Sequence, residues 1–389
     1  MYGINYGRIA YNLPSLKSVV TLLKAAKIKN IRIYDVNHEV LTAFNGSGIE
    51  IVVGLGSEFL TEMGVNEDRA MSWIKENVQP LLPGTSICGI VVENEILATK
   101  NVYNALDRLD LTKVVQVQSP HSLGVFANLF PPSSCTFKED IVPYMKPILQ
   151  FFSQIVSPFF INAYPFLTYM IHYDNVFDAQ IDAAYVALEK AGFGKMQVIV
   201  SETGWPSRGD ESEAGASKKN ARTYNNNLCK RLAKKKGTPY GPKIPMKASV
   251  FALFNENLKP GGTSERNFGL FKADGSVAYD IGCIGLNPCL AASSLLSVKM
   301  ITLAASSNEH TVDAYQKSYA MIDLYGDNQQ HPSMTGMGSN VGLHSGKATI
   351  VGSSKPILNP VVVIGKGRPP YLRKSSTMEK RVLKVKTNK

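Results

Sequence analysis

Two glutamates stand at the ends of apolar, strand-like runs and could act together in acid–base chemistry. Glu95 ends the run of residues 89–95, and Glu202 ends the run of residues 198–202, directly before a Thr-Gly-Trp-Pro segment. Two facing carboxyl groups, one protonated and one ionised, are the minimum for cleaving a glycosidic bond. A single strand-end glutamate can equally cap the next helix or pair with an arginine, so the presence of two favours the catalytic interpretation.

Short apolar runs alternate with amphipathic helical patterns over residues 1–282. This alternation favours an α/β fold of the (β/α)8 TIM-barrel type over an open doubly wound sheet. The doubly wound sheet would require a GxGxxG segment after the first strand, and none is present. The eight runs expected to form strands are residues 2–6, 30–35, 50–55, 87–95, 113–119, 159–164, 197–202 and 248–254.

A barrel of this type places its functional side chains at the carboxyl ends of its strands, where the βα loops begin. Polar residues close five of the expected strands: Asp35, Asn94, Glu95, Asn162, Tyr164, Glu202, Asn255 and Glu256. The fourth and seventh strands lie on opposite sides of a barrel's mouth. We therefore expect Glu95 and Glu202 to face each other across a cleft.

The composition excludes several classes of protein and locates the charge. The 389 residues are 44% hydrophobic, which excludes wholesale disorder. No uninterrupted apolar run reaches the roughly 18 residues typical of a transmembrane helix. The net charge is +11, but residues 355–389 hold ten basic residues and one acidic residue, which leaves 32 basic and 30 acidic residues, or +2, for residues 1–354. The basicity belongs to a tail and says little about what the main domain binds.

The cysteines and the first residues bear on the cellular compartment. Five cysteines, at positions 88, 135, 229, 283 and 289, are odd in number and include no CxxC pair, so neither a disulfide framework nor a zinc site is expected. The opening MYGINYGRIA has neither the charged nor the apolar region of a secretory signal peptide. One N-glycosylation sequon begins at Asn45 and would matter only in a secreted protein.

Longer motifs run from about residue 3 to residue 281: NYGRIA, NIRIYD, NEI, SPFFINAYPF, VIVSETGWPS and FNENLKPGGTSERNFGLF. Together they resemble the plant glucan endo-1,3-β-glucosidases of glycoside hydrolase family 17. The resemblance implies a (β/α)8 barrel that hydrolyses β-1,3-linked glucan with retention and without a cofactor, with Glu95 as proton donor and Glu202 as nucleophile. The motif positions implied to line the substrate cleft are Tyr34, Asn94, Asn162, Tyr164, Phe254, Glu256, Lys259 and Glu265.

The residue types agree with these implied roles. Asn94 could hydrogen-bond a sugar 2-hydroxyl, a contact that strengthens as charge develops at the anomeric carbon. Lys259 would supply positive charge to Glu256 and Glu265. The resemblance further implies a monomer in the extracellular space, cell wall or vacuole, with a role in plant defence.

The chain also departs from the family pattern. Glu93 replaces a usual glycine, and strand alternation predicts that it points into the barrel below Glu95, with Arg32 as a hypothesised partner, unless it lies near enough to the mouth to reach water. The loops after Glu95 and after Met170 are shorter than those of the family, and both belong to the cleft wall. An impaired relative that binds β-glucan without cleaving it is therefore the alternative interpretation.

The basic tail carries a separate, short resemblance. ILNP at residues 357–360 and GKGRPP at residues 365–370 resemble the end of transposase-derived plant proteins of the FAR1 type, and Gly-Arg-Pro beside lysine resembles an AT-hook, which binds the minor groove of DNA. The alternative is a solvated, disordered tail. The expected organisation is a barrel at residues 1–282, a low-order linker at residues 283–354 and a basic tail at residues 355–389.

Overall fold

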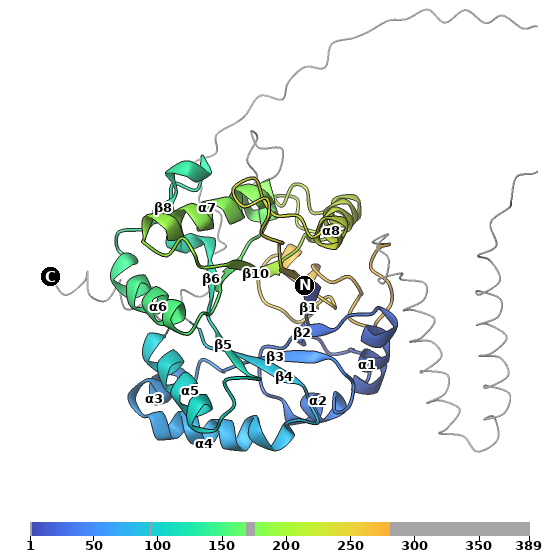
Figure 1. Cartoon of the computed structure of the whole chain (residues 1–389). Helices are drawn as coiled ribbons and strands as arrows, with labels where there is room; N and C mark the ends of the chain where they lie inside the picture. Colours follow the sequence, from blue (N-terminus) through green and yellow to red (C-terminus); the bar gives the residue numbers. More distant parts are fainter. Residues whose placement is uncertain (1, 94, 169–175, 281–389) are drawn as a thin grey trace, which may run out of the picture.

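Nine strands form one parallel sheet in the part of the chain that the computed structural model describes, residues 2–93, 95–168 and 176–280. Their order is β5-β4-β3-β2-β1-β11-β10-β9-β6. The two outer members, β5 and β6, are separated in the chain only by Ser119, so the chain itself closes the sheet into a barrel (Figure 1). The strands are β1 (Tyr2–Asn5), β2 (Asn30–Arg32), β3 (Glu50–Gly54), β4 (Ile87–Val91), β5 (Gln116–Gln118), β6 (Pro120–Ser122), β9 (Phe159–Asn162), β10 (Val198–Thr203) and β11 (Ala248–Phe251).

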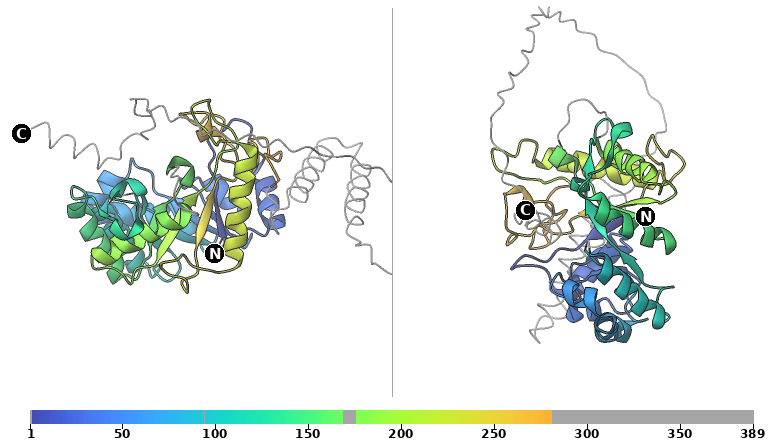
Figure 2. Two further views of the ribbon diagram at one scale, coloured as in Figure 1. Left: turned by 90° about the horizontal axis from the view of Figure 1, so that it is seen from above. Right: turned by 90° about the vertical axis from the view of Figure 1, so that its left-hand side faces the viewer.

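Helices surround the strands on the outside of this ring, as Figures 1 and 2 show. A small antiparallel hairpin of β7 (Phe126–Ala127) and β8 (Thr136–Phe137) lies between β6 and α6 in the chain. The α-helices of the described residues are α1 (Leu16–Ala25), α2 (His38–Ala43), α3 (Leu60–Val65), α4 (Glu67–Asn77), α5 (Ile96–Arg108), α6 (Val142–Gln154), α7 (Val176–Lys190) and α8 (Lys218–Ala233).

Several helices begin where the sequence supplies a capping side chain. The Ser15 hydroxyl accepts the Ser18 N–H at the start of α1, and the Asn66 side chain accepts the Asp68 N–H at the start of α4. Glu67 and Asp68 also place negative charge in the first turn of α4, where the helix dipole favours it. The cap of α1 fixes where the first βα loop ends, and the cap of α4 separates α4 from α3.

All eight strands expected from the sequence are present, and the barrel is confirmed. Three of them end three or four residues before the end of their apolar runs: β2 ends at Arg32, β4 at Val91 and β11 at Phe251. The reason is that burial continues beyond the hydrogen-bonded strand, as the buried residues 252–254 show. The sequence does not predict β6, because this short strand begins with proline, which is depleted in strands.

Several expectations fall outside the described residues: Asn94, the segment after Met170, the linker at residues 283–354 and the tail at residues 355–389. Within the described ranges, no helix combines the length and hydrophobicity of a membrane span. Cys88 and Cys135 are free thiols, whereas Cys229 in α8 is disulfide-bonded. One disulfide therefore exists, although the cysteine spacing indicates no disulfide framework.

Candidate active site

Glu202 lies on β10 at a point where the register of that strand changes. The parallel pairings of β10 with β9 and with β11 both shift register directly after Val200. Such a bulge redirects side chains and is over-represented beside active sites. Only 2% of Glu202 is exposed. A carboxylate buried to this degree needs charged or hydrogen-bonding partners.

Three side chains from outside β10 hold the Glu202 carboxylate. The Tyr34 hydroxyl donates to Oε1 and the Tyr164 hydroxyl donates to Oε2, each at 3.0 Å. Arg32, at the end of β2, places a guanidinium nitrogen 3.2 Å from Oε1. The two hydroxyl donors and the cation stabilise negative charge on both oxygens, and they fix the direction in which the carboxylate points.

The residues on either side of Glu202 are anchored to other elements. The Ser201 hydroxyl donates to a backbone carbonyl of β9 at 3.0 Å and lies 2.8 Å from Asn162 Oδ1. The Thr203 hydroxyl hydrogen-bonds the Tyr224 hydroxyl of α8. Three consecutive side chains of β10 are thus tied to three different parts of the barrel, which keeps the carboxylate of Glu202 in place.

Tyr34 remains a hydrogen-bond donor at neutral pH. Desolvation by burial, and then the charge of Glu202, raise the pKa of the Tyr34 hydroxyl well above its usual value, while Arg32 opposes the change. The residue as a whole is 39% exposed. Tyr34 therefore offers part of its surface to a ligand while its hydroxyl contacts Glu202.

A second group of charges lies after β11. Lys259 Nζ is 3.0 Å from Glu265 Oε2 and 3.9 Å from Glu256 Oε2. The same ammonium lies 4.4 Å from the centre of the Phe251 ring, within the range of a cation–π contact. The expectation that Lys259 supplies positive charge to both glutamates is confirmed.

The backbone of the first βα loop packs closely against Glu256. The Ile9 N–H donates to Glu256 Oε1 at 3.1 Å, and a Cβ atom at Gly7 would come within 2.3 Å of that oxygen. Burial raises the pKa of Glu256, and neighbouring carboxylates add to the effect, while the Ile9 N–H and Lys259 oppose it. Only glycine leaves room at position 7 for this buried carboxyl group.

A cavity of about 500 Å³ is lined by Tyr34, which contacts Glu202, and by Glu256 and Lys259. Its volume suits a small saccharide. Arg8 and Asp35 form an ion pair in its wall, and the Asp35 side chain is 55% exposed. The residues that line the cavity are Tyr6, Arg8, Ile9, Tyr34, Asp35, Phe251, Glu256 and Lys259.

Glu95 occupies the N-cap position of α5, one residue before the helix begins. Residues 92–95 connect the end of β4 to the start of α5. A Cβ atom at Gly64, near the end of α3, would lie 4.0 Å from Glu95 Cγ. The side chain of Glu95 is half-buried, and its Cγ lies beside the end of α3.

The expectation for Glu93 is corrected. Glu93 is exposed, and Arg32 pairs with Glu202 instead. Because β4 ends at Val91, the alternation of a strand no longer determines the direction of residue 93. Of the two possibilities for Glu93, contact with water is the one that the structure bears out.

Comparison with known proteins assigns this barrel to a family. The sequence profile of glycosyl hydrolases family 17 matches residues 2–283. The chain belongs to this family. Glucan endo-1,3-beta-glucosidase 14 of Arabidopsis thaliana is 42% identical over 340 residues, which cover 77% of the chain and 87% of that relative.

Solved structures agree with the family 17 assignment. CJP38, a beta-1,3-glucanase and allergen of Cryptomeria japonica pollen, superposes with a TM-score of 0.68 at 35% identity, over 72% of this chain and 97% of CJP38. A plant beta-glucan endohydrolase superposes with a TM-score of 0.67 at 32% identity, over 72% of this chain and 99% of that chain.

The structure brings Tyr34, Asn162 and Tyr164 of this family 17 member to Glu202, and Glu256 and Glu265 to Lys259. Asn94 lies outside the described residues, and Glu95 lies beside the end of α3. Phe254 is fully buried and packs against Tyr6 and Phe271, so it lies in the core instead of lining the cavity. Phe251 lines the cavity in its place. The pairing of Arg32 with Glu202 is not predicted from the sequence, although the two-residue spacing of Arg32 and Tyr34 indicates that their side chains point the same way.

Proposed function

We propose that this family 17 glycosyl hydrolase cleaves internal β-1,3-glucosidic bonds of β-glucans with retention of configuration. The observation that carries the proposal is the buried Glu202 carboxylate, held by Arg32 and by the hydroxyls of Tyr34 and Tyr164 beside an open cavity. The β-1,3-glucanases to which the chain is similar support the choice of substrate.

In the proposed reaction Glu202 is the nucleophile and Glu95 the proton donor. Glu95 protonates the glycosidic oxygen as a Glu202 oxygen bonds to the anomeric carbon, and the leaving sugar departs as an alcohol. Glu95 then removes a proton from water, which attacks the glycosyl–enzyme ester and releases Glu202. Two inversions at the same carbon give net retention, and no metal or organic cofactor takes part.

Further residues are proposed to bind the sugar units. Tyr34 offers its exposed surface, and the Glu256–Lys259–Glu265 group offers charged hydrogen-bond partners for hydroxyls. Asn162 and Tyr164 lie next to Glu202 through their contacts with Ser201 and with the carboxylate itself. Asn94 keeps its proposed contact with the 2-hydroxyl of the sugar.

The release of reducing sugar from laminarin tests this assignment. We expect activity in the parent chain and a loss of at least about 10³-fold in Glu202→Ala and in Glu95→Ala, because each carboxyl group has its own chemical role. Glu211→Ala, which removes an exposed glutamate, serves as the matched control and should retain full activity. Full activity in Glu202→Ala would refute the assignment, and an α-configured first product in an NMR time course would refute retention.

A glucan-binding relative with impaired catalysis is the second candidate. The loops after Glu95 and after Met170 favour it, because they are shorter than those of the family and both belong to the cleft wall. For this candidate we expect laminarin to raise the Tm of the chain without being cleaved. Measurable hydrolysis by the parent chain excludes it.

We also propose where the chain acts and in which oligomeric state. The chain is proposed to act as a monomer outside the cell, in the cell wall or in the vacuole, and the disulfide at Cys229 supports an oxidising compartment. Size-exclusion chromatography with light scattering tests the monomer, and fractionation of expressing tissue tests the location. For the ten basic residues of the tail at residues 355–389, a solvated tail is the favoured interpretation, and non-specific binding of nucleic acid is the alternative.

A further inference from the structure

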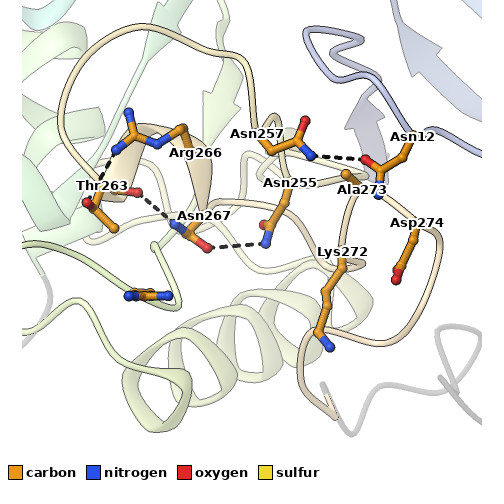
Figure 3. A pocket seen from close by; sticks show the side chains of 10 residues that line it. Asn12, Asn255, Asn257, Thr263, Arg266, Asn267, Lys272, Ala273 and Asp274 are labelled. Atoms are coloured by element: carbon orange, nitrogen blue, oxygen red, sulfur yellow. Dashed lines mark hydrogen bonds between the residues drawn. The ribbon is translucent and has the colours of Figure 1, made fainter.

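A second cavity, of about 430 Å³, lies beside the chain segment that carries Glu256. Glu256 lines the cavity beside Glu202, whereas its two neighbours, Asn255 and Asn257, line the second cavity. The two cavities therefore lie on opposite sides of one short segment after β11. Figure 3 shows the second cavity, which takes its other walls from the loop after β1, the loop after β10 and the segment of residues 263–274.

Fixed side-chain amides form much of this second cavity. Asn255 donates to Asn267 Oδ1 at 3.3 Å and accepts the Gly269 N–H at 2.8 Å. Asn257 donates to Asn12 Oδ1 at 3.0 Å (Figure 3). Because these amides are already held by the protein, a ligand that binds to them loses little affinity to ordering them.

The cavity carries charges of both signs: Arg208, Arg266 and Lys272 line it together with Asp274, and Asp210 accepts the N–H of the lining residue Thr263. Arg266 is engaged by its own loop, since it donates to the Gly261 carbonyl at 2.7 Å. Arg208 and Lys272 are exposed and form no ion pair with any other residue in the described ranges. Asp274, the acidic residue in the lining, accepts the Ser276 N–H. Two cations thus remain for an anionic group of a ligand.

We propose that this second cavity binds an acidic saccharide, a sugar that carries a carboxylate, such as a uronate. The carboxylate would pair with Arg208 and Lys272, and the hydroxyls would bind the fixed amides. A neutral sugar lacks the group that the two cations attract. No aromatic side chain of the described residues lines the cavity, so stacking on a sugar face does not contribute.

Isothermal titration calorimetry of the full chain with glucuronic acid, glucose and inorganic phosphate tests the proposal. We expect saturable binding of glucuronic acid, weakened about tenfold by Arg208→Gln and by Lys272→Gln, each of which removes a charged partner. Lys243→Gln, at an exposed lysine outside the cavity, is the matched control and should bind like the parent. Laminarin hydrolysis should be unchanged in all three variants.

Each other outcome overturns a defined part of the proposal. Equal affinity for glucose would remove the role of the two cations. Equal affinity for phosphate would reduce the cavity to a simple anion site. No binding of glucuronic acid, or binding that neither variant weakens, would reject the site entirely. These results are independent of the proposed glucanase activity, because neither Arg208 nor Lys272 contacts Glu202 or its partners.

Discussion

At the scale of single residues, Glu202 depends on hydroxyl donors that come from two different loops. Tyr34 and Tyr164 each donate to one of its oxygens at 3.0 Å. We expect Tyr34→Phe and Tyr164→Phe each to lower kcat on laminarin about tenfold, because a hydrogen bond to a charged group contributes about 1.5–3 kcal/mol and the rest of each ring is kept. Steady-state kinetics with a parallel Tm measurement would check this.

Tyr144→Phe is the matched control for these two variants, since it removes a hydroxyl from an exposed tyrosine outside the cavity beside Glu202. It should leave kcat unchanged. If Tyr34→Phe and Tyr164→Phe keep the parent kcat while their Tm falls, the two hydroxyls stabilise the fold and do not serve the nucleophile.

Substitution of Glu93, unlike that of Tyr34 or Tyr164, is expected to have little effect. Because Glu93 is exposed and Arg32 pairs with Glu202, we expect Glu93→Gly to change the free energy of unfolding by less than about 1 kcal/mol. Urea denaturation at neutral pH would measure this. A clear gain in stability would mean that Glu93 is strained within the barrel after all.

Glu202, the proposed nucleophile, is easier to predict from the sequence than the residues around it. Glu202 ends an apolar run within a long motif, so both pattern and resemblance point to it. Its partner Arg32 is invisible to such patterns, because the pairing depends on how the ends of β2 and β10 meet across the barrel. Phe254 is expected in the cleft from its motif position alone, whereas the structure buries it in the core beyond the end of β11.

At the scale of elements, the strand that closes the barrel contains a buried histidine. His121 of β6 is fully buried and stacks on Phe159 of β9, with ring centres 4.9 Å apart. Neither of its ring nitrogens has a hydrogen-bond partner among the described residues. Desolvation lowers the pKa of His121 to about 4. The folded barrel therefore holds this side chain in its neutral form.

This histidine makes the stability of the barrel depend on pH. A lowered pKa means that the unfolded chain binds the proton more tightly, so stability is lost as pH falls from about 6.5 towards 4. Over this pH range we expect the free energy of unfolding of His121→Leu to fall by about 3 kcal/mol less than that of the parent chain. Urea denaturation at several pH values would measure this. The exposed His38→Gln is the control. Parallel pH profiles for the parent and His121→Leu would contradict the prediction.

At the scale of the whole molecule, the sequence alone locates the charge but does not show how the barrel closes. The barrel closes through Ser119, between β5 and β6, and the family match ends at residue 283. Sequence patterns predict the eight strands because each is an apolar run, but they do not show how the ring closes, since β6 lacks such a run. The position of the excess positive charge can be determined from the sequence alone, because the charge is concentrated in residues 355–389.

Removal of this tail tests whether the tail binds DNA independently of the hydrolysis of laminarin. Truncation after residue 354 removes ten basic residues and leaves all five cysteines in place. We expect laminarin hydrolysis within about twofold of the parent, and loss of low-salt binding to duplex DNA, because that binding depends on lysine and arginine contacts with phosphates. Fluorescence anisotropy at several salt concentrations would measure it, with A·T-rich and G·C-rich duplexes compared.

Preference for the A·T-rich duplex would indicate minor-groove recognition by the Gly-Arg-Pro segment, and equal binding would indicate a non-specific contact. DNA binding that survives the truncation would place the contact on the barrel, against the near-neutral charge of residues 1–354.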